Sequence, residues 1–359
     1  MAKRLTYAMV GGGPDGFIGD AHRRAIGLDG TAAIAAGVFS RNREKSLQMA
    51  ESLGISPDRC YEDYQTMARA EGEREDGIDF VTVVTPNQSH YEICRAFLEA
   101  GIHVVCDKPV TTTYRQAKEL EALAEDKGLL FMVTYTYMGY VTAKYARELV
   151  ASGAIGEVRT VHGGKYPQGW LAFEGTTFGG KQGEWRCDPG QSGGVNCLGD
   201  LGTHVENAVA AMTGLKIKRL LAKMDVIVPG RVLDDNDSIL VEYDNGATGI
   251  YWTSQVAVGH DNSLRIRIYG SKGTIQWFQE TPDKITVIDA DNTIREIHRG
   301  YGAIGERAGK YARIPAGHPE GWFEAMGNLY RSFAQCVSAK KGWNVYSGNG
   351  GLSHGESGR

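Results

Sequence analysis

The stretch that decides the fold reads LTYAMVGGGPDG, residues 5–16. Its first six residues are mostly apolar and β-forming, which predicts a buried strand. Gly11, Gly13 and Gly16 then satisfy the G-x-G-x-x-G spacing, which lets the backbone turn tightly beside a pyrophosphate at the start of a helix. Its position directly after a strand favours a dinucleotide site, with these predicted cofactor-binding residues: Gly11, Gly13, Pro14, Asp15, Gly16, Phe17 and Ile18.

The pattern continues outward as alternating strands and helices. Further apolar runs occupy residues 32–39, 80–85, 103–106 and 129–134, with helical periodicity at 43–53, 91–100 and 114–126. Such alternation is typical of right-handed crossovers and a parallel sheet covered on both faces. We therefore expect an α/β Rossmann domain with a parallel doubly wound sheet over residues 1–137.

The periodicity changes after Tyr137. A helical stretch at 143–152 precedes segments of period-two alternation at 158–163, 220–228, 238–243, 247–254, 264–269 and 274–278. Asp244-Asn245-Gly246 is a strong hairpin signal because Asn-Gly readily adopts positive φ. We expect a C-terminal α+β domain with an open, mainly antiparallel sheet over 138–341, a late helix at 318–339 and a disordered Gly/Ser-rich tail at 342–359.

Composition narrows the class of protein. A chain of 359 residues can form two domains, and its net charge of −4 gives no electrostatic case for nucleic acid or an anionic membrane. No apolar run is long enough to span a bilayer, and no signal-peptide core precedes Leu5, so we expect a cytoplasmic protein. Six scattered cysteines without a CxxC pair favour reduced thiols and no metal site.

Lys108 stands out in the segment Val104-Val105-Cys106-Asp107-Lys108-Pro109-Val110. The carboxyl ends of parallel strands are where open α/β sheets bind ligands. A lysine there can act as an acid or base if its surroundings tune its proton affinity, although an isolated Lys-Pro would be read as solvated. At the end of the preceding strand, Thr85, Pro86, Asn87 and then His90 offer small polar groups to the nicotinamide half of a dinucleotide.

The second strand is followed by Ser40 and Arg41, and then by Arg43. NAD-selective sheets usually carry an acid here for the ribose 2′-hydroxyl. These residues could instead hold a 2′-phosphate, or they could simply begin a solvated helix. The predicted cofactor is therefore NAD or NADP, with the phosphate preference open.

Asp200 and His204 precede the apolar helical pattern of residues 205–212. Their i, i+4 spacing puts both side chains on one face near a helix start, where the carboxylate can orient and the histidine can relay a proton. Alone, they would be read as a helix cap and a core histidine. Together with Lys108 they make a complete site for alcohol oxidation, with hydride passing to nicotinamide.

These motifs resemble the Gfo/Idh/MocA sugar oxidoreductases over roughly 340 residues, because four motifs occur in order at suitable separations. The resemblance implies that Lys108 is the catalytic lysine, with Asp200 and His204 completing the site, and that Asp107 stands where the family frequently has Glu. Asp107 and Lys108 are also among the predicted cofactor-binding residues. It also implies oligomer contacts through the open sheet, hence a dimer or tetramer. Asn207 stands where the family often has an acid.

Other segments resemble a branch whose members oxidise glycosides, anhydrosugars or inositols, including enzymes acting on the C3 hydroxyl of glucosyl groups. Sugar C–H faces stack on aromatic rings while sugar hydroxyls seek polar groups, although Trp and Tyr are also common core residues. The predicted substrate-binding residues are Tyr135, Tyr137, Gln168, Trp170, Trp185, Arg186 and His318.

The resulting hypothesis is an NAD(P)-dependent sugar or glycoside dehydrogenase that converts a ring secondary hydroxyl, such as a glucoside C3 hydroxyl, to a ketone. Glycosides of plant phenols are included among its candidate substrates. Two alternatives are an NAD-dependent glycosidase of the same fold and a non-catalytic dinucleotide sensor that regulates a partner. The sequence leaves open the sugar, the carbon, the direction and the subunit count.

Overall fold

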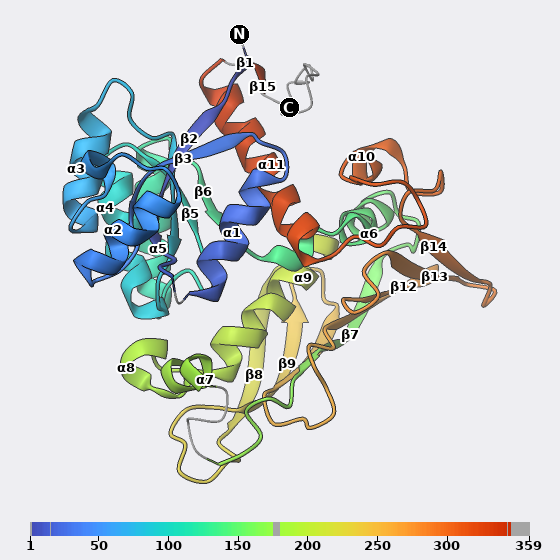
Figure 1. Ribbon diagram of the computed structural model, residues 1–359. Helices are drawn as coiled ribbons and strands as arrows, with labels where there is room; N and C mark the ends of the chain where they lie inside the picture. The colour runs from blue at the N-terminus through green and yellow to red at the C-terminus, as the bar shows by residue number, and fades with distance from the viewer. Residues whose placement is uncertain (1, 15, 175–179, 343, 346–359) are drawn as a thin grey trace. The chain divides into compact units, whose positions relative to one another are not determined.

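The computed structural model describes residues 2–14, 16–174, 180–342 and 344–345 (Figure 1). Two compact units share the chain. The N-terminal unit contains residues 1–134 together with 326–359, and the C-terminal unit contains residues 135–325. Asp15 and most of the expected disordered tail, residues 343 and 346–359, lie outside the described residues.

The N-terminal unit is built on a five-stranded parallel sheet in the order β3-β2-β4-β5-β6. Its strands are β2 (Leu5–Gly11), β3 (Ala32–Val38), β4 (Phe80–Val84), β5 (His103–Cys106) and β6 (Phe131–Val133). Every residue of β4 and β5 is buried, as expected for a parallel sheet covered on both faces. Strand β3 lies on one side of β2, and β4, β5 and β6 follow on its other side. The strand order therefore reverses between β2 and β4.

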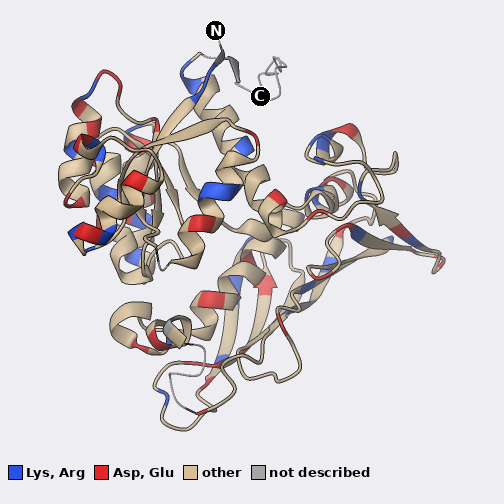
Figure 2. Ribbon diagram, viewed as in Figure 1, with Lys and Arg blue, Asp and Glu red and all other residues tan. Residues whose placement is uncertain are grey.

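Helices cover this sheet as the alternating sequence predicts (Figure 1). They are α1 (Phe17–Gly27), α2 (Arg43–Ser52), α3 (Tyr64–Glu73), α4 (His90–Glu99) and α5 (Tyr114–Asp126). Side-chain oxygens of Asn42, Asp63 and Thr113 cap α2, α3 and α5 by accepting backbone N–H groups of the first turn. Acidic and basic residues are interspersed along these helices, as expected of solvated faces (Figure 2).

The C-terminal unit is built on an eight-stranded sheet in the order β14-β13-β12-β11-β7-β10-β9-β8. Its strands are β7 (Val158–Pro167), β8 (Ile217–Asp225), β9 (Asn236–Tyr243), β10 (Thr248–Ser254), β11 (Arg265–Gly270), β12 (Gly273–Phe278), β13 (Lys284–Asp289) and β14 (Ile294–His298). Only the pairing of β7 with β10 is parallel among these strands, so the expected open, mainly antiparallel sheet is confirmed. The two strands β13 and β14 were not expected.

One face of this sheet packs against α6 (Val141–Ala151) and α9 (Thr203–Thr213). The core between them includes Val205, Val209 and Trp277, all essentially inaccessible to solvent. The shorter helices of the chain are η1 (Pro57–Arg59), η2 (Asn87–Ser89), η3 (Thr136–Gly139), α7 (Gly180–Cys187), α8 (Pro189–Ser192), the π-helix η4 (Leu198–Gly202) and α10 (Glu306–Gly309).

The late helix, α11 (Trp322–Lys340), differs from the expected domain assignment. From Met326 onward it groups with the N-terminal unit, whereas the sequence pattern placed all of 138–341 in the second domain. The physical reason is packing: the Phe333 and Tyr330 rings lie 5.3 and 6.4 Å from the Phe80 ring of β4. After this helix, β15 (Asn344–Val345) pairs with β1 (Ala2–Lys3), so these two residues of the expected disordered tail form a strand.

No helix in the described parts of the chain combines the length and the apolar character needed to cross a bilayer.

Candidate functional site

The glycine-rich turn lies between β2 and α1 in the N-terminal unit. Gly11 has a φ of +89°, which residues other than glycine rarely adopt. The Gly16 N–H donates to the Gly13 carbonyl at 2.9 Å. Helix α1 begins at Phe17, directly after the turn, so the positive end of its dipole lies there. Phe17 itself is exposed.

Gly19 shows how closely this turn approaches α1. A Cβ built on Gly19 would lie 2.2 Å from the Gly12 Cα, closer than real Cβ contacts come. The turn therefore needs glycine on both sides of the contact. A tight glycine turn of this kind, at a helix start beside the reversal of strand order, fits the pyrophosphate of a dinucleotide.

The end of β3 holds the residues expected near a 2′-phosphate. Ser40 is half-buried, and its Oγ accepts the Asn42 N–H at 3.1 Å. Arg41 is exposed. Arg43 instead donates to the carbonyls of Cys60 and Tyr61 at 2.7 and 3.0 Å, so it braces the fold and only Ser40 and Arg41 remain as candidates.

The ends of β4 and β5 are joined by His90. Its Nε2 lies 2.8 Å from the Thr85 carbonyl and its Nδ1 lies 2.8 Å from the Pro109 carbonyl. His90 is buried, so both ring nitrogens serve the protein itself and its contribution is to hold the segment after Lys108 against the segment after β4. Asn87, in the same segment, is also buried.

Asp107 turns its carboxylate into the N-terminal unit. The Thr134 hydroxyl donates to Asp107 Oδ1 at 2.7 Å, and His22 Nε2 lies 3.8 Å from the same oxygen. The backbone N–H of Asp107 continues the ladder by donating to Val83 at 2.9 Å. Lys108 therefore leaves a strand end that is fixed on both sides.

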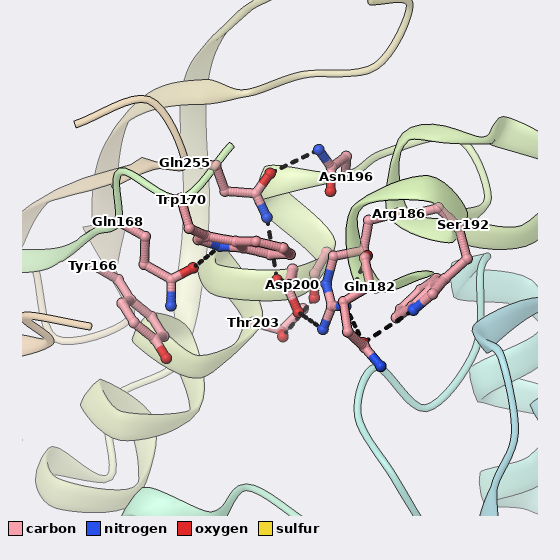
Figure 3. A network of polar contacts seen from close by, with 12 residues as sticks. Tyr166, Gln168, Trp170, Gln182, Arg186, Ser192, Asn196, Asp200, Thr203 and Gln255 are labelled. Atoms are coloured by element: carbon pink, nitrogen blue, oxygen red, sulfur yellow. Dashed lines mark hydrogen bonds and ion pairs between the residues drawn. The ribbon is translucent and has the colours of Figure 1, made fainter. Parts of the chain in front are cut away.

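In the C-terminal unit, Asp200 is the centre of a polar network (Figure 3). Arg186 Nε donates to Asp200 Oδ2 at 3.0 Å, and its Nη2 lies 3.4 Å from Oδ1. Gln255 Nε2 also donates to Oδ2 at 3.1 Å. The Asp200 and Arg186 side chains are 12% and 17% exposed, which makes this a largely desolvated pair with a defined geometry.

Arg186 is itself held in place. Its guanidinium stacks over the Trp185 ring at 4.3 Å and lies 5.5 Å from the Trp170 ring. Gln182 Oε1 accepts from Arg186 Nη1 at 2.7 Å and from Trp185 Nε1 at 3.1 Å. Three of the predicted substrate-binding residues thus lie together beside Asp200.

A second chain of hydrogen bonds starts at Trp170. Its Nε1 donates to Gln168 Oε1 at 2.7 Å (Figure 3). Gln168 Nε2 in turn donates to Asn262 Oδ1 at 2.5 Å. Tyr166 donates to the same Asn262 oxygen at 3.2 Å and bonds the hydroxyl of Tyr137. The predicted residues Gln168, Trp170 and Tyr137 are therefore parts of one network.

His204 sits in a cage of tyrosines at the start of α9. Its ring centre lies 4.7, 5.5 and 5.8 Å from those of Tyr137, Tyr135 and Tyr166. The π-helical turn that carries Asp200 ends one residue before α9. Such turns often mark functional sites, because they re-aim side chains within a helix.

A buried acid pair supports this turn from behind. Asp234 accepts the backbone N–H groups of Asn196 and Leu198 at 2.7 and 2.6 Å. The Asp237 carboxylate lies within 4.8 Å of it, is fully buried and accepts from Thr253 at 3.0 Å. Burial, and then the charge of Asp234, raise the pKa of Asp237 to about 7, so Asp237 is partly protonated in neutral solution.

Gln255, Asn196 and Asp234 belong to the site but were not predicted from the sequence. Gln255 could have been found, since Thr253, Ser254 and Gln255 are three polar residues in a row at a strand end, and all are buried. His318 lies in the loop before α11 with an exposed side chain, and its backbone carbonyl accepts from Arg299. The described contacts do not link His318 to the Asp200 network.

A parallel sheet with a glycine turn at the reversal of its strand order, followed by a mainly antiparallel unit, is typical of a dinucleotide-binding protein. Family models match both parts: the NAD-binding Rossmann fold of the GFO/IDH/MocA oxidoreductases matches residues 5–135, and the GFO/IDH/MocA C-terminal domain matches residues 143–276. The chain belongs to this family of NAD-dependent sugar and polyol oxidoreductases.

Several relatives are similar over most of their length. An uncharacterized oxidoreductase of Bacillus subtilis, YfiI, is 39% identical over 344 residues, covering 95% of this chain and 87% of the relative. The crystal structure of an inositol dehydrogenase homolog complexed with NAD+ from Azotobacter vinelandii has a TM-score of 0.89 at 36% identity, covering 95% and 88% of the two chains. A levoglucosan dehydrogenase complexed with NADH and levoglucosan has a TM-score of 0.80 at 25% identity, covering 95% and 91%.

Proposed function

We propose that the protein oxidises a ring secondary hydroxyl of a sugar or glycoside, with the C3 hydroxyl of a glucosyl group as the favoured position. The observation that carries the proposal is the desolvated Arg186–Asp200–Gln255 network beside the caged His204. Relatives described as inositol and levoglucosan dehydrogenases support a polyol or sugar substrate.

The bound dinucleotide supplies a nicotinamide that accepts hydride. The chain contributes the glycine turn of residues 11–16 with Phe17 and Ile18 for its phosphates, and Thr85, Pro86 and Asn87 for its nicotinamide half. Ser40 and Arg41 remain the residues that would decide between NAD and NADP, because a 2′-phosphate needs donors where NAD-selective sheets carry an acid.

Lys108 is proposed to take the proton of the reacting hydroxyl, and His204 to assist this transfer. Asp200 has its two oxygens engaged by Arg186 and Gln255, which suits a group that orients the substrate more than one that receives the proton. Trp170 and Trp185 offer aromatic surface for the C–H face of a pyranose ring or for the arene of a phenolic glycoside.

A substrate panel tests this proposal. The full chain is assayed by nicotinamide absorbance with methyl glucoside, levoglucosan, myo-inositol, an aryl C-glucoside and free aldoses, each with NAD and NADP. We expect turnover of at least one glycoside or polyol, and its loss in Lys108→Ala with NADH binding retained. Lys127→Ala, at an exposed position of the same unit, is the matched control.

Three results would contradict the proposal. Turnover that survives in Lys108→Ala would remove the lysine from the chemistry. Release of free sugar with no net change in NADH would favour the glycosidase alternative, and nucleotide binding without turnover on the whole panel would favour a dinucleotide sensor.

We also propose a homo-oligomer formed through the open sheet. On one face of β8, β9 and β10 the apolar side chains of Leu221, Leu240 and Ile250 are neighbours across the strands and are 43–70% exposed. Contiguous exposed apolar residues on a sheet are typical of a protein–protein contact.

A further inference from the structure

We propose that His22 is a positioning residue for Lys108, acting through a buried array of Tyr330, His22 and Asp107 that keeps a carboxylate ionised beside the lysine. All four residues belong to the N-terminal unit. The inference rests on the proposed function, in which Lys108 takes up the proton of the substrate.

The array joins three separate parts of the chain. His22 lies on α1, has no exposed surface and places its Nδ1 2.5 Å from the Tyr330 hydroxyl of α11. Its other ring nitrogen, Nε2, lies 3.8 Å from Asp107 Oδ1 at the end of β5. The Tyr330 hydroxyl also lies 3.4 Å from the Thr82 hydroxyl of β4.

The chemistry of these groups determines which atom donates and which accepts in each contact of the array. Within the described residues, His22 Nε2 is buried and makes no hydrogen bond, so the carboxylate at 3.8 Å is the charge that it faces. An ionised carboxylate only accepts, which favours the tautomer with hydrogen on Nε2. Nδ1 is then an acceptor, and the Tyr330 hydroxyl is its donor.

The Asp107 carboxylate stays ionised although it is largely buried. Burial by itself would raise the pKa of this carboxyl, but His22, the Thr134 hydroxyl and Lys108 together hold it well below its usual range. The other titratable groups that face it, the Cys106 thiol and the Tyr330 phenol, have their pKa values raised by burial and stay neutral.

An ionised neighbour is useful to a lysine that accepts a proton, because it stabilises the ammonium that forms. The segment that follows Lys108 is held by His90, whose Nδ1 lies 2.8 Å from the Pro109 carbonyl oxygen. His22 therefore acts on the reaction indirectly, through the charge of Asp107, and not by contact with the substrate.

Four variants of the full chain test the inference with a substrate from the panel above. Tyr330→Phe preserves volume and leaves Nδ1 without its donor, and His22→Gln removes the ring. Asp107→Asn mimics the protonated carboxyl, and Asp107→Glu retains the charge. Tyr7→Phe, which removes another buried hydroxyl of the same unit, is the matched control.

The measurement is kcat relative to the unmodified chain between pH 5 and pH 9, with NADH affinity and Tm recorded for every variant. In His22→Gln the burial of Asp107 is opposed only by the Thr134 hydroxyl and Lys108, so the pKa of Asp107 rises. Once pH falls below that pKa, the ionised fraction, and with it relative kcat, should fall about tenfold for each pH unit. Tyr330→Phe should show a smaller fall in the same direction. Asp107→Asn should be low at every pH, and Asp107→Glu should restore activity.

Relative kcat that stays constant with pH in both His22→Gln and Tyr330→Phe, at the level of Tyr7→Phe, would overturn the inference. If Lys108→Ala remains active, the proposed function fails instead. The array can then be examined without turnover, from the ring nitrogens of 15N-labelled histidine in the full chain, with His22 assigned by its loss in His22→Gln. Hydrogen on Nδ1 in place of Nε2 would refute the array itself.

Discussion

Replacement of Arg186 by methionine tests how much the Arg186–Asp200 ion pair contributes to stability and activity. Methionine keeps much of the apolar stem but removes both donors, at 3.0 and 3.4 Å, leaving the Gln255 contact at 3.1 Å. Removing one partner of a fully buried pair costs about 3–5 kcal/mol. Because these two side chains retain 17% and 12% exposure, we expect the free energy of unfolding to fall by about 2–3 kcal/mol. We also expect kcat/KM to fall, because Asp200 loses the donors that orient it.

The assay is steady-state oxidation of a panel substrate, with Tm measured in parallel. Arg295→Met is a matched control, because Arg295 also grips its partner Asp289 through Nε and Nη2, at 3.0 and 2.8 Å, but those side chains are 51% and 40% exposed. That control should change kcat/KM and stability little, since exposed pairs contribute about 0–1 kcal/mol. A fall in Tm in Arg186→Met no larger than that in Arg295→Met would refute the reasoning.

Three further predictions follow from other parts of the chain. Gly19→Ala places a Cβ 2.2 Å from the Gly12 Cα, so NADH affinity measured by fluorescence titration should fall at least about 10-fold, and an unchanged Kd would contradict the tight turn. The raised pKa of Asp237 means that its neutral form is favoured by folding; the stability it contributes is lost as pH rises from its ordinary value of 3.8 to about 7, so urea unfolding should show a flatter pH dependence in Asp237→Asn. Leu240→Arg on the open sheet should lower the mass measured by light scattering, while an unchanged mass would place the oligomer contact elsewhere.

Local signals predicted most of the fold. The Asn245-Gly246 turn joins β9 and β10 as expected, with Gly246 at a φ of +86°. Strand β13 was predictable as well, since Ile285 and Val287 alternate with less buried residues, whereas β14 buries only Ile297 and gives little periodic signal. The position of α11 was not predictable, because the apolar pattern of a helix does not indicate which of two sheets the helix packs against.

The candidate site divides in the same way. Spacing alone predicted that Asp200 and His204 follow one another at a helix start, and the structure adds a π-helical turn there. The partners of Asp200 come from 14 and 55 residues away, so their pairing depends on tertiary structure that no local pattern encodes. Arg43 shows the reverse case, in which a plausible ligand for phosphate is used to bind backbone carbonyls.

The position of α11 has a consequence for biosynthesis. The chain leaves the N-terminal unit after residue 134 and returns to it at residue 326, so the part of α11 from Met326 onward, which is synthesised only after residues 135–325, supplies aromatic side chains that cover Phe80. Until α11 is synthesised, the apolar surface of the parallel sheet around Phe80 lacks the helix that covers it. During translation, the nascent Rossmann sheet is therefore exposed to aggregation while the C-terminal unit is being synthesised, and it is a segment that a chaperone would protect.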